Sequence, residues 1–151
     1  MKHLFDATSV KEVQARIAQL RPESAALWGT MNPAQALAHC ALAMEWAVGD
    51  RIPPRVDWLG RIMGRIVKPM VLRNDAPMRR NSPTAKDLVV QDARDLGTER
   101  DRLHGLIGRF AASGPAGCTT HPHGFFGRLT PEEWATLTYK HLDHHLRQFG
   151  A

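Results

Sequence analysis

The sequence predicts an all-α fold: a four-helix bundle in up-down-down-up order, whose second and third helices are joined by a long, helix-containing crossover. Four segments with helical spacing of apolar residues are bounded by capping residues, and almost none of the chain alternates as a strand would. Roughly forty residues separate the second and third segments, too many for a structureless loop. The shorter links make the first and second helices antiparallel, and likewise the third and fourth. The length of 151 residues suits one domain, which we expect over 1–151.

The first two helices are marked by their N-terminal residues. The segment "TSVKEVQARIAQL" opens with Ser9 and Glu12 in a capping-box pattern, which predicts a helix over about 10–20. In "MNPAQALAHCALAMEWAVGD", Asn32 is the expected N-cap, with a proline next and a glycine after the last periodic residue. The second helix is therefore predicted over about 33–48.

The last two helices have equally clear limits. The segment "DARDLGTERDRLHGLIGRFAASGP" predicts a helix over about 95–112 that stops at Gly114 and the proline after it. Near the C-terminus, Thr130 and Glu133 form a second capping-box pattern around a proline. A helix over about 131–148 follows from it.

The crossover contains an amphipathic segment, "DWLGRIMGRIVKPM". Its apolar side is formed by Trp58, Leu59, Ile62, Met63, Ile66 and Val67. Its polar side carries Arg61, Arg65 and Lys68. Such a helix could lie on an anionic membrane, but covering the end or side of its own bundle is the commoner use. We expect the second arrangement.

Composition narrows the partners and the compartment. No apolar run is long enough to span a membrane, and the N-terminus lacks the apolar core of a secretory signal, so a cytoplasmic protein without a membrane partner is expected. The formal charge of +5 is scattered, with no basic tract and no interleaved aromatics, which argues against nucleic acid. Cys40 and Cys118 form no CxxC and are read as small apolar residues.

The tail "YKHLDHHLRQFGA" holds three of the eight histidines. On a helical wheel His141 and His145 project into the bundle one turn apart, His144 lies at the edge of that face, and Asp143 points outward. The predicted solvent face consists of Glu132, Glu133, Thr136, Lys140, Asp143 and Arg147. Burying two imidazoles is costly without partners, and an i, i+4 pair lets both reach one ion.

A third ligand is expected from the second helix, where His39 stands in the nearly all-apolar "AQALAHCALAMEW". A lone histidine on a buried helix is usually a hydrogen-bonded core residue. Facing an inward pair on another helix, it completes a set of three ligands. The sequence thus predicts a divalent metal held by His39, His141 and His145, with zinc or nickel as the expected ion, although imidazole ligands also suit copper and iron.

The segments "WGTMNPAQALAHCALAMEWA" and "HPHGFFGRLTPEEWATLTYKHLDHHLRQFG" resemble the DinB/YfiT-like metalloenzyme superfamily, in its domain of unknown function 1569 branch. The resemblance implies an up-down-down-up bundle in which His39, His141 and His145 bind a divalent metal, and a homodimer formed through bundle faces. The expected loop pattern HP-aromatic-FG is extended here to "HPHGFFG", which adds His123.

Two functional hypotheses follow. Three neutral histidines leave open metal positions that can activate water or a thiol, and the resemblance implies a small-molecule substrate and a low-molecular-weight thiol, as in thiol-dependent S-transferases. The first hypothesis is therefore a metal-dependent enzyme. The alternative is a non-catalytic metal- or ligand-binding helical protein, related to stress.

Two further histidines are candidates for moving protons at the rim of the site. His144 titrates in a suitable range when unperturbed, but a hydrogen bond to a neighbouring element is the commoner role. His123, like His121, is expected in a surface loop, with a place at the pocket mouth as the alternative. Trp46 and Trp134 flank the proposed ligands on their wheels and are read as core or pocket wall.

Overall fold

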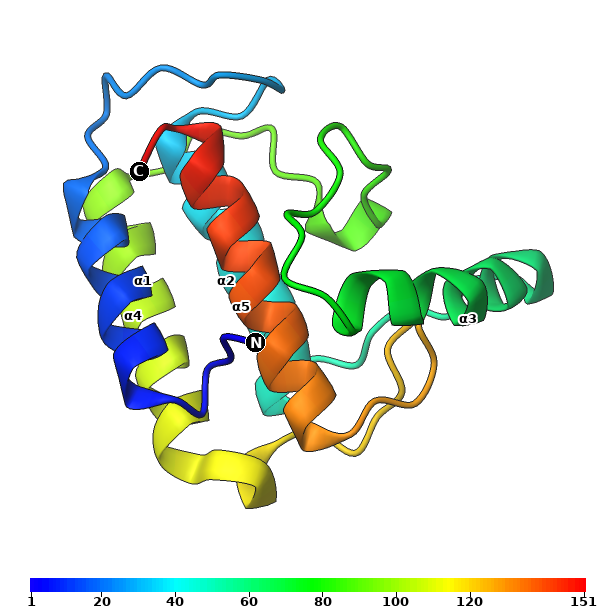
Figure 1. Ribbon diagram of the computed structural model, residues 1–151. Helices are drawn as coiled ribbons and strands as arrows, with labels where there is room; N and C mark the ends of the chain where they lie inside the picture. Colours follow the sequence, from blue (N-terminus) through cyan, green and yellow to red (C-terminus); the bar gives the residue numbers. More distant parts are fainter.

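The computed structural model describes residues 1–151 and is all-helical, with no β-strand, as predicted (Figure 1). Its five α-helices are α1 (Ala7–Gln19), α2 (Pro33–Val48), α3 (Trp58–Leu72), α4 (Leu96–Ser113) and α5 (Pro131–Gln148). Two short 3-10 helices, η1 (Lys86–Leu88) and η2 (Gly114–Gly117), lie before and after α4. None of the helices is both long and apolar enough to cross a membrane.

Capping residues set most helix starts where the sequence predicts them. Asn32 at α2 and Thr130 at α5 each form a capping box with the residue three positions later. At α1 the prediction is wrong: the N-cap is Asp6, and its carboxylate accepts hydrogen bonds from both the backbone N–H and the hydroxyl of Ser9, at 2.8 and 2.6 Å. A carboxylate at the N-cap is also favoured by the helix dipole, so α1 begins three residues earlier.

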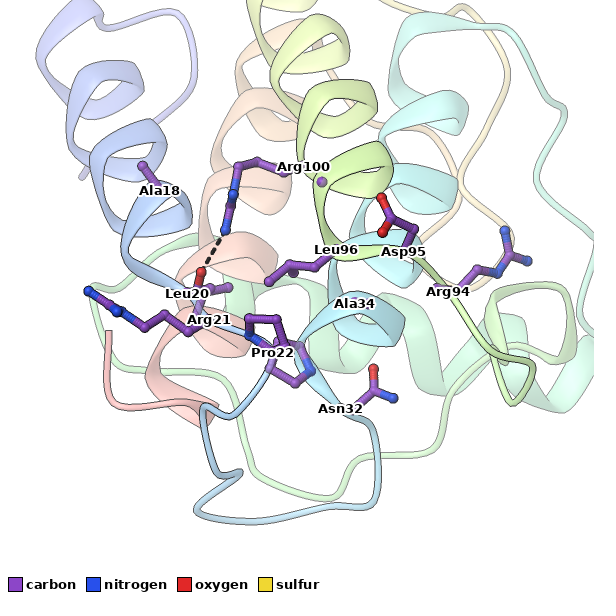
Figure 2. Close-up of a pocket in the computed structure, with 12 residues that line it drawn as sticks. Ala18, Leu20, Arg21, Pro22, Asn32, Ala34, Arg94, Asp95, Leu96 and Arg100 are labelled. Carbon is purple, nitrogen blue, oxygen red and sulfur yellow. Dashed lines mark hydrogen bonds between the residues drawn. The ribbon is translucent and has the colours of Figure 1, made fainter.

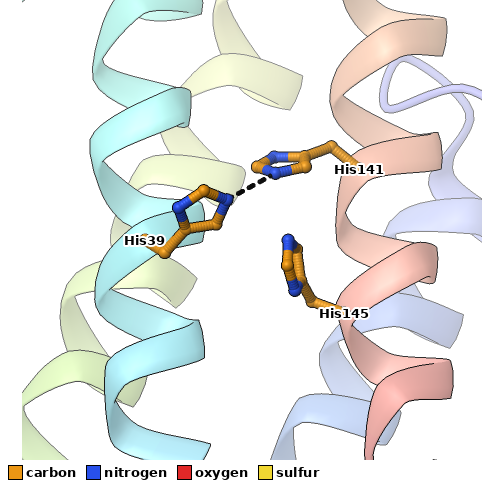
Figure 3. A group of neighbouring side chains, drawn as sticks. All are labelled: His39, His141 and His145. Carbon is orange, nitrogen blue, oxygen red and sulfur yellow. Dashed lines mark hydrogen bonds between the residues drawn. The ribbon is translucent and has the colours of Figure 1, made fainter. Parts of the chain in front are cut away.

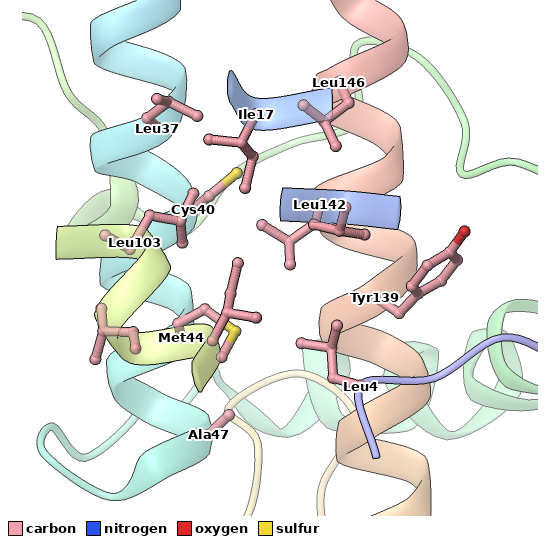
Figure 4. Close-up of a cluster of buried hydrophobic side chains, with 14 of the residues drawn as sticks. Leu4, Ile17, Leu37, Cys40, Met44, Ala47, Leu103, Tyr139, Leu142 and Leu146 are labelled. Carbon is pink, nitrogen blue, oxygen red and sulfur yellow. The ribbon is translucent and has the colours of Figure 1, made fainter. Parts of the chain in front are cut away.

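Helices α1, α2, α4 and α5 pack around one hydrophobic core and are called the helix core below. Both α1 and α2 contact α4 and α5. Figure 4 shows part of this core, in which Cys40 and Met44 of α2, Ile17 of α1 and Leu142 of α5 point into the space between α2 and α5, all of them buried. Cys40 acts here as the small apolar residue expected, and burial raises the pKa of its thiol.

Helix α3 stands apart, to one side of the helix core (Figure 1). The expectation that its apolar side covers the bundle is wrong, because Trp58, Ile66 and Met70 are 72, 57 and 66 % exposed. The side that touches the core is instead the one with Gly64 and Lys68, where a Cβ on Gly64 would lie 1.7 Å from the Phe125 carbonyl oxygen. Only glycine permits so close an approach, and this fixes which face of α3 turns inward.

Two residues of the predicted solvent face of α5 are buried, because the end of α3 and the following loop cover them. These residues are Thr136 and Lys140. The Lys140 ammonium donates to the carbonyl oxygens of Val71 and Asn74, at 2.7 and 2.9 Å, and so satisfies the C-terminal end of α3. Asp143 is not one of the clustered histidines' neighbours at the metal centre, as predicted, but it does not face solvent either: it packs against α1 and forms an ion pair with Arg16 at 2.7 Å.

Candidate metal centre

Three histidines meet between α2 and α5. His39 comes from α2, and His141 and His145 come from successive turns of α5 (Figure 3). One ring nitrogen from each can be chosen so that all three lie within 4.8 Å of one another. The ring centroids are 4.7 to 4.8 Å apart for each of the three pairs. The three predicted ligands are thus brought together, and they form the only such group of histidine, cysteine and carboxylate side chains found in the structure.

The local sequence explains this placement. The spacing of four residues puts His141 and His145 on one face of α5, and Leu142 and Leu146 beside them pack into the core and fix the rotation of the helix. On α2, small residues surround His39 and let the helix approach closely. His39 is 3 % exposed, whereas the two histidines of α5 are only partly buried and keep some surface open to solvent.

The crossover orients the His39 ring. Its Nδ1 lies 2.8 Å from the backbone carbonyl oxygen of Leu88, in η1. Because a carbonyl only accepts, Nδ1 carries the proton and Nε2 presents a lone pair to the other two histidines. Metal-binding histidines are typically held by such a bond from the second ring nitrogen. A backbone carbonyl leaves no trace in a sequence pattern, so this partner was not predicted.

His145 is oriented in the same way by Gln148. The His145 Nδ1 lies 2.9 Å from the side-chain oxygen of Gln148, whose amide nitrogen donates to the carbonyl oxygen of Trp28 at 2.7 Å. Because the Gln148 amide nitrogen is used in this hydrogen bond to Trp28, the amide oxygen is the end of Gln148 that faces the imidazole. His145 therefore also carries its proton on Nδ1 and presents Nε2. Gln148 lies on the same helical face as the ligands, three residues after His145, and that spacing is the signal that could have revealed its role.

The electrostatics keep all three imidazoles neutral. Burial lowers the pKa of each, and the nearby histidines lower the pKa of His141 and His145 further, that of His145 to about 3. The His39 and His141 Nε2 atoms are 2.8 Å apart. Since the His39 Nε2 is an acceptor, the His141 Nε2 is the donor of this bond. Neutral imidazoles are the form that binds metal, without competition from protons at neutral pH.

His123 is not the surface-loop residue expected. Its ring lies among Trp46, Trp134 and Phe126, at centroid distances of 5.9, 5.4 and 4.9 Å. Its Nδ1 accepts the backbone N–H of Phe125 and of Phe126, so Nε2 carries the proton. Burial lowers its pKa to about 4. His121, in contrast, is exposed as predicted.

The two tryptophans beside His123 are core residues. Trp46 and Trp134 are 4 and 2 % exposed, and the indole N–H of each is buried without a hydrogen-bond partner. Each stands seven residues from a predicted ligand on its own helix. They enclose His123 at the end of the α2–α5 face, two turns from the three histidines.

His144 lies outside the group of three. Its ring packs against those of Trp28 and His145, at centroid distances of 5.6 and 5.0 Å. Burial lowers its pKa, opposed by a hydrogen bond with the Met78 backbone and by Asp143. Met78 belongs to the crossover loop, so His144 lies beside a neighbouring element, and the hydrogen bond expected for it stays a prediction.

A separate hollow of about 600 Å³ lies at the N-terminal ends of α2 and α4 (Figure 2). Three arginines line it, but Arg94 is paired with Asp92 and Glu99, and Arg100 donates to the Leu20 carbonyl oxygen. The side chain of Asp95 already caps α4. With two of its three arginines and its aspartate bonded within the protein, the hollow is a weaker site than the three histidines.

The comparisons with known proteins give one match. The model of a family described as "Protein of unknown function (DUF1569)" covers residues 2–151. No curated protein and no solved structure matches the chain.

Proposed function

The chain belongs to the DUF1569 family, and we propose that it is a divalent-metal-dependent enzyme whose metal is held by His39, His141 and His145. The observation that carries the proposal is the convergence of three neutral imidazoles from two helices on one point. Buried polar side chains need partners, and the one proton on the His141 Nε2 satisfies only one of the two lone pairs that His39 and His145 present. A divalent cation satisfies all three.

The donor set fits such an ion. In tetrahedral zinc coordination the nitrogens are about 3.3 Å apart, so the 2.8 Å between the Nε2 atoms of His39 and His141 requires only a small outward shift. The Leu88 carbonyl and the Gln148 amide already hold two of the rings by their far nitrogens. Zinc and nickel are the ions we propose, from a group of imidazole-binding metals that also includes copper and iron.

Three protein ligands favour catalysis over a purely structural role. A divalent ion with three histidine ligands keeps an open position, where bound water or a thiol loses its proton near neutral pH. The chain's contribution is to hold His141 and His145 where solvent reaches them, and to keep His39 buried behind them. This supports an enzyme that uses water or a low-molecular-weight thiol on a small molecule, such as an S-transferase.

The proposal extends to the wider fold. We infer that α1, α2, α4 and α5 form the up-down-down-up bundle of the DinB-like superfamily, with the metal between facing helices. The contacts of α2 with α4 and α5, and of α1 with the same two helices, support the packing of four helices around one core. A cytoplasmic location is part of the same proposal.

Metal content tests the binding step. Untagged protein should contain close to one divalent metal per chain by elemental analysis, and His39→Gln should lose nearly all of it. Asp143→Asn is the matched control, since Asp143 sits on the same helix as two ligands but pairs with Arg16 and Arg147. Equal metal loss in both variants would reject the assignment.

Cobalt substitution tests the open position. The visible spectrum of the cobalt-loaded protein should change when a small thiol is titrated in, because the thiolate enters the coordination sphere. An unchanged spectrum, with cobalt still bound, would favour the alternative hypothesis of a non-catalytic metal-binding protein with a closed site.

A further inference from the structure

Helix α3 presents a continuous apolar surface to solvent. Six large apolar side chains on it are between 47 and 72 % exposed, and these are Trp58, Leu59, Ile62, Met63, Ile66 and Met70. Each is three or four residues from another member of the set, which places them along one side of the helix. Scattered exposed apolar residues are ordinary, but a stripe along a whole helix marks a surface that binds something.

The opposite side of α3 is fastened to the helix core, so this exposure is built into the fold. Gly64 lies against the Phe125 carbonyl, and one turn later the Lys68 ammonium donates to the Arg128 carbonyl oxygen at 2.8 Å and pairs with Glu133 at 2.7 Å. Gly64 and Lys68 share a stripe because they are four residues apart. Ile62 and Ile66 lie on the far side of the helix from it.

The charge of the protein is concentrated around this helix. Between Arg51 and Arg80 the chain carries eight arginines or lysines and two aspartates, a net charge of +6. The whole chain has a formal charge of +5, so the remainder sums to −1. No ion pair is formed by Arg55, Arg61, Arg65, Arg73 or Arg79, all of which are exposed.

We propose that the exposed face of α3 docks on an anionic lipid surface. An amphipathic helix with tryptophan and aliphatic residues on one side and arginines along its borders lies in the plane of the membrane interface, its apolar side in the headgroup region and its cations on anionic headgroups. The arginine stems add apolar contact while their guanidinium groups stay in water. This replaces the expectation of no membrane partner, and it does not depend on the metal.

Charge decides against a second copy of the chain as the occupant. Helix α3 contains no acidic residue, so two copies of this face would bring unpaired arginines together without counter-charges. Lipid phosphates supply those charges. The membrane is therefore the occupant that satisfies both the apolar stripe and the cations.

Vesicle co-sedimentation of the full chain tests the proposal. We expect binding to vesicles that contain phosphatidylglycerol, weaker binding at high salt, and little binding to pure phosphatidylcholine. Ile62→Ser/Ile66→Ser and Arg61→Glu/Arg65→Glu should each lower the bound fraction at least tenfold. The matched control is Leu27→Ser, since Leu27 is 67 % exposed in the loop between α1 and α2 and should bind as the parent does.

The fluorescence of Trp58 gives a second readout that needs no folding-sensitive variant. Anionic vesicles should shift the emission of the parent protein to the blue, and Trp58→Phe should remove most of that shift. Absence of sedimentation with anionic vesicles, or equal binding to neutral ones, would overturn the proposal. So would a dimer in lipid-free solution, seen by light scattering, that Ile62→Ser/Ile66→Ser dissociates.

Discussion

The α2–α5 face and the outer face of α3 reverse the usual distribution of side chains in opposite ways. Between α2 and α5, three imidazoles lie inside the helix core, where apolar residues are expected. On α3, large apolar residues lie outside, where polar ones are expected. Each reversal is unfavourable for the isolated chain, and each is relieved by a different partner: a cation for the buried histidines, and a lipid surface for the exposed helix.

The two regions also differ in how firmly their geometry is set. The histidines are held by rigid helices and by specific bonds to Leu88 and Gln148. Helix α3 is held by the Gly64 contact, by Lys68 and Lys140, and by a few apolar residues at its C-terminal end. A precise site needs orientation by its surroundings, whereas an interfacial helix needs only that the correct side faces out.

The largest effect is expected at the buried region. His141→Ala should abolish metal binding, because two imidazoles on opposite helices hold a divalent ion far less tightly than three. The matched control is His144→Ala, three residues along the same helix and outside the group, which should keep the metal stoichiometry of the parent. Calorimetric titration with zinc measures the stoichiometry of both variants. If His144→Ala lost as much metal as His141→Ala, the assignment of His141 as a ligand and His144 as a non-ligand would be wrong.

The next largest effect is expected in the stability of the fold at acid pH, where protonation of His123 favours the unfolded state. Its pKa is about 4 in the folded protein and near 6.5 in the unfolded chain. The unfolded state therefore binds more protons, and stability present above pH 6.5 falls as the pH drops toward 4, by about 3 kcal/mol from this residue.

The check is urea unfolding of the metal-free protein between pH 7 and 4, with His123→Asn for comparison. Asparagine offers an oxygen to the backbone N–H groups that His123 Nδ1 now accepts. The variant should lose less stability over this interval. If the unfolding free energies of the parent and of His123→Asn fell by the same amount between pH 7 and 4, His123 would not be buried as a neutral ring.

A smaller effect is expected from the residue that orients His145. Gln148→Leu removes the acceptor for the Nδ1 proton, and such outer partners contribute about 10- to 100-fold in metal affinity. Stoichiometry at saturating metal should be unchanged, since all three ligands remain. An affinity equal to that of the parent would mean that the His145 ring is held by packing alone.

The smallest effect is expected at the attachment of α3. Lys68→Met removes the bonds to Glu133 and Arg128, but the ion pair is partly exposed and contributes about 1 kcal/mol or less. Thermal unfolding should therefore change little. A loss of several kcal/mol would contradict this expectation and show that the Lys68 bonds are essential to the packing of α3 on the helix core.

The sequence predicted the helices and the three histidines because both depend on local patterns. Caps such as Asn32 and Thr130 mark helix starts, and the spacing of His141 and His145 determines that they share a face. What failed depends on distant contacts. On the helical wheel Lys140 lies on the solvent face, and only the folded structure shows that the end of α3 covers it. Leu88 holds the His39 ring through its backbone carbonyl, which no side-chain pattern reveals.

The face of α3 that turns inward was misjudged for a related reason. The wheel separates an apolar side from a basic side, and apolar sides usually face the core. Gly64 on the other side allows the backbone of α3 to reach the Phe125 carbonyl, which a larger residue would prevent. Gly64 is the signal available in the sequence, because a residue without a Cβ can mark a close backbone approach.

X-ray absorption spectroscopy of the zinc-loaded, untagged protein tests the central claim most directly. The account predicts imidazole scattering from three histidines with nitrogens at about 2.0 to 2.1 Å, one further exchangeable oxygen ligand, and no sulfur. A sulfur shell at about 2.3 Å would place the ion on Cys40 or Cys118 instead. Scattering from fewer than three imidazoles would contradict the site formed by His39, His141 and His145.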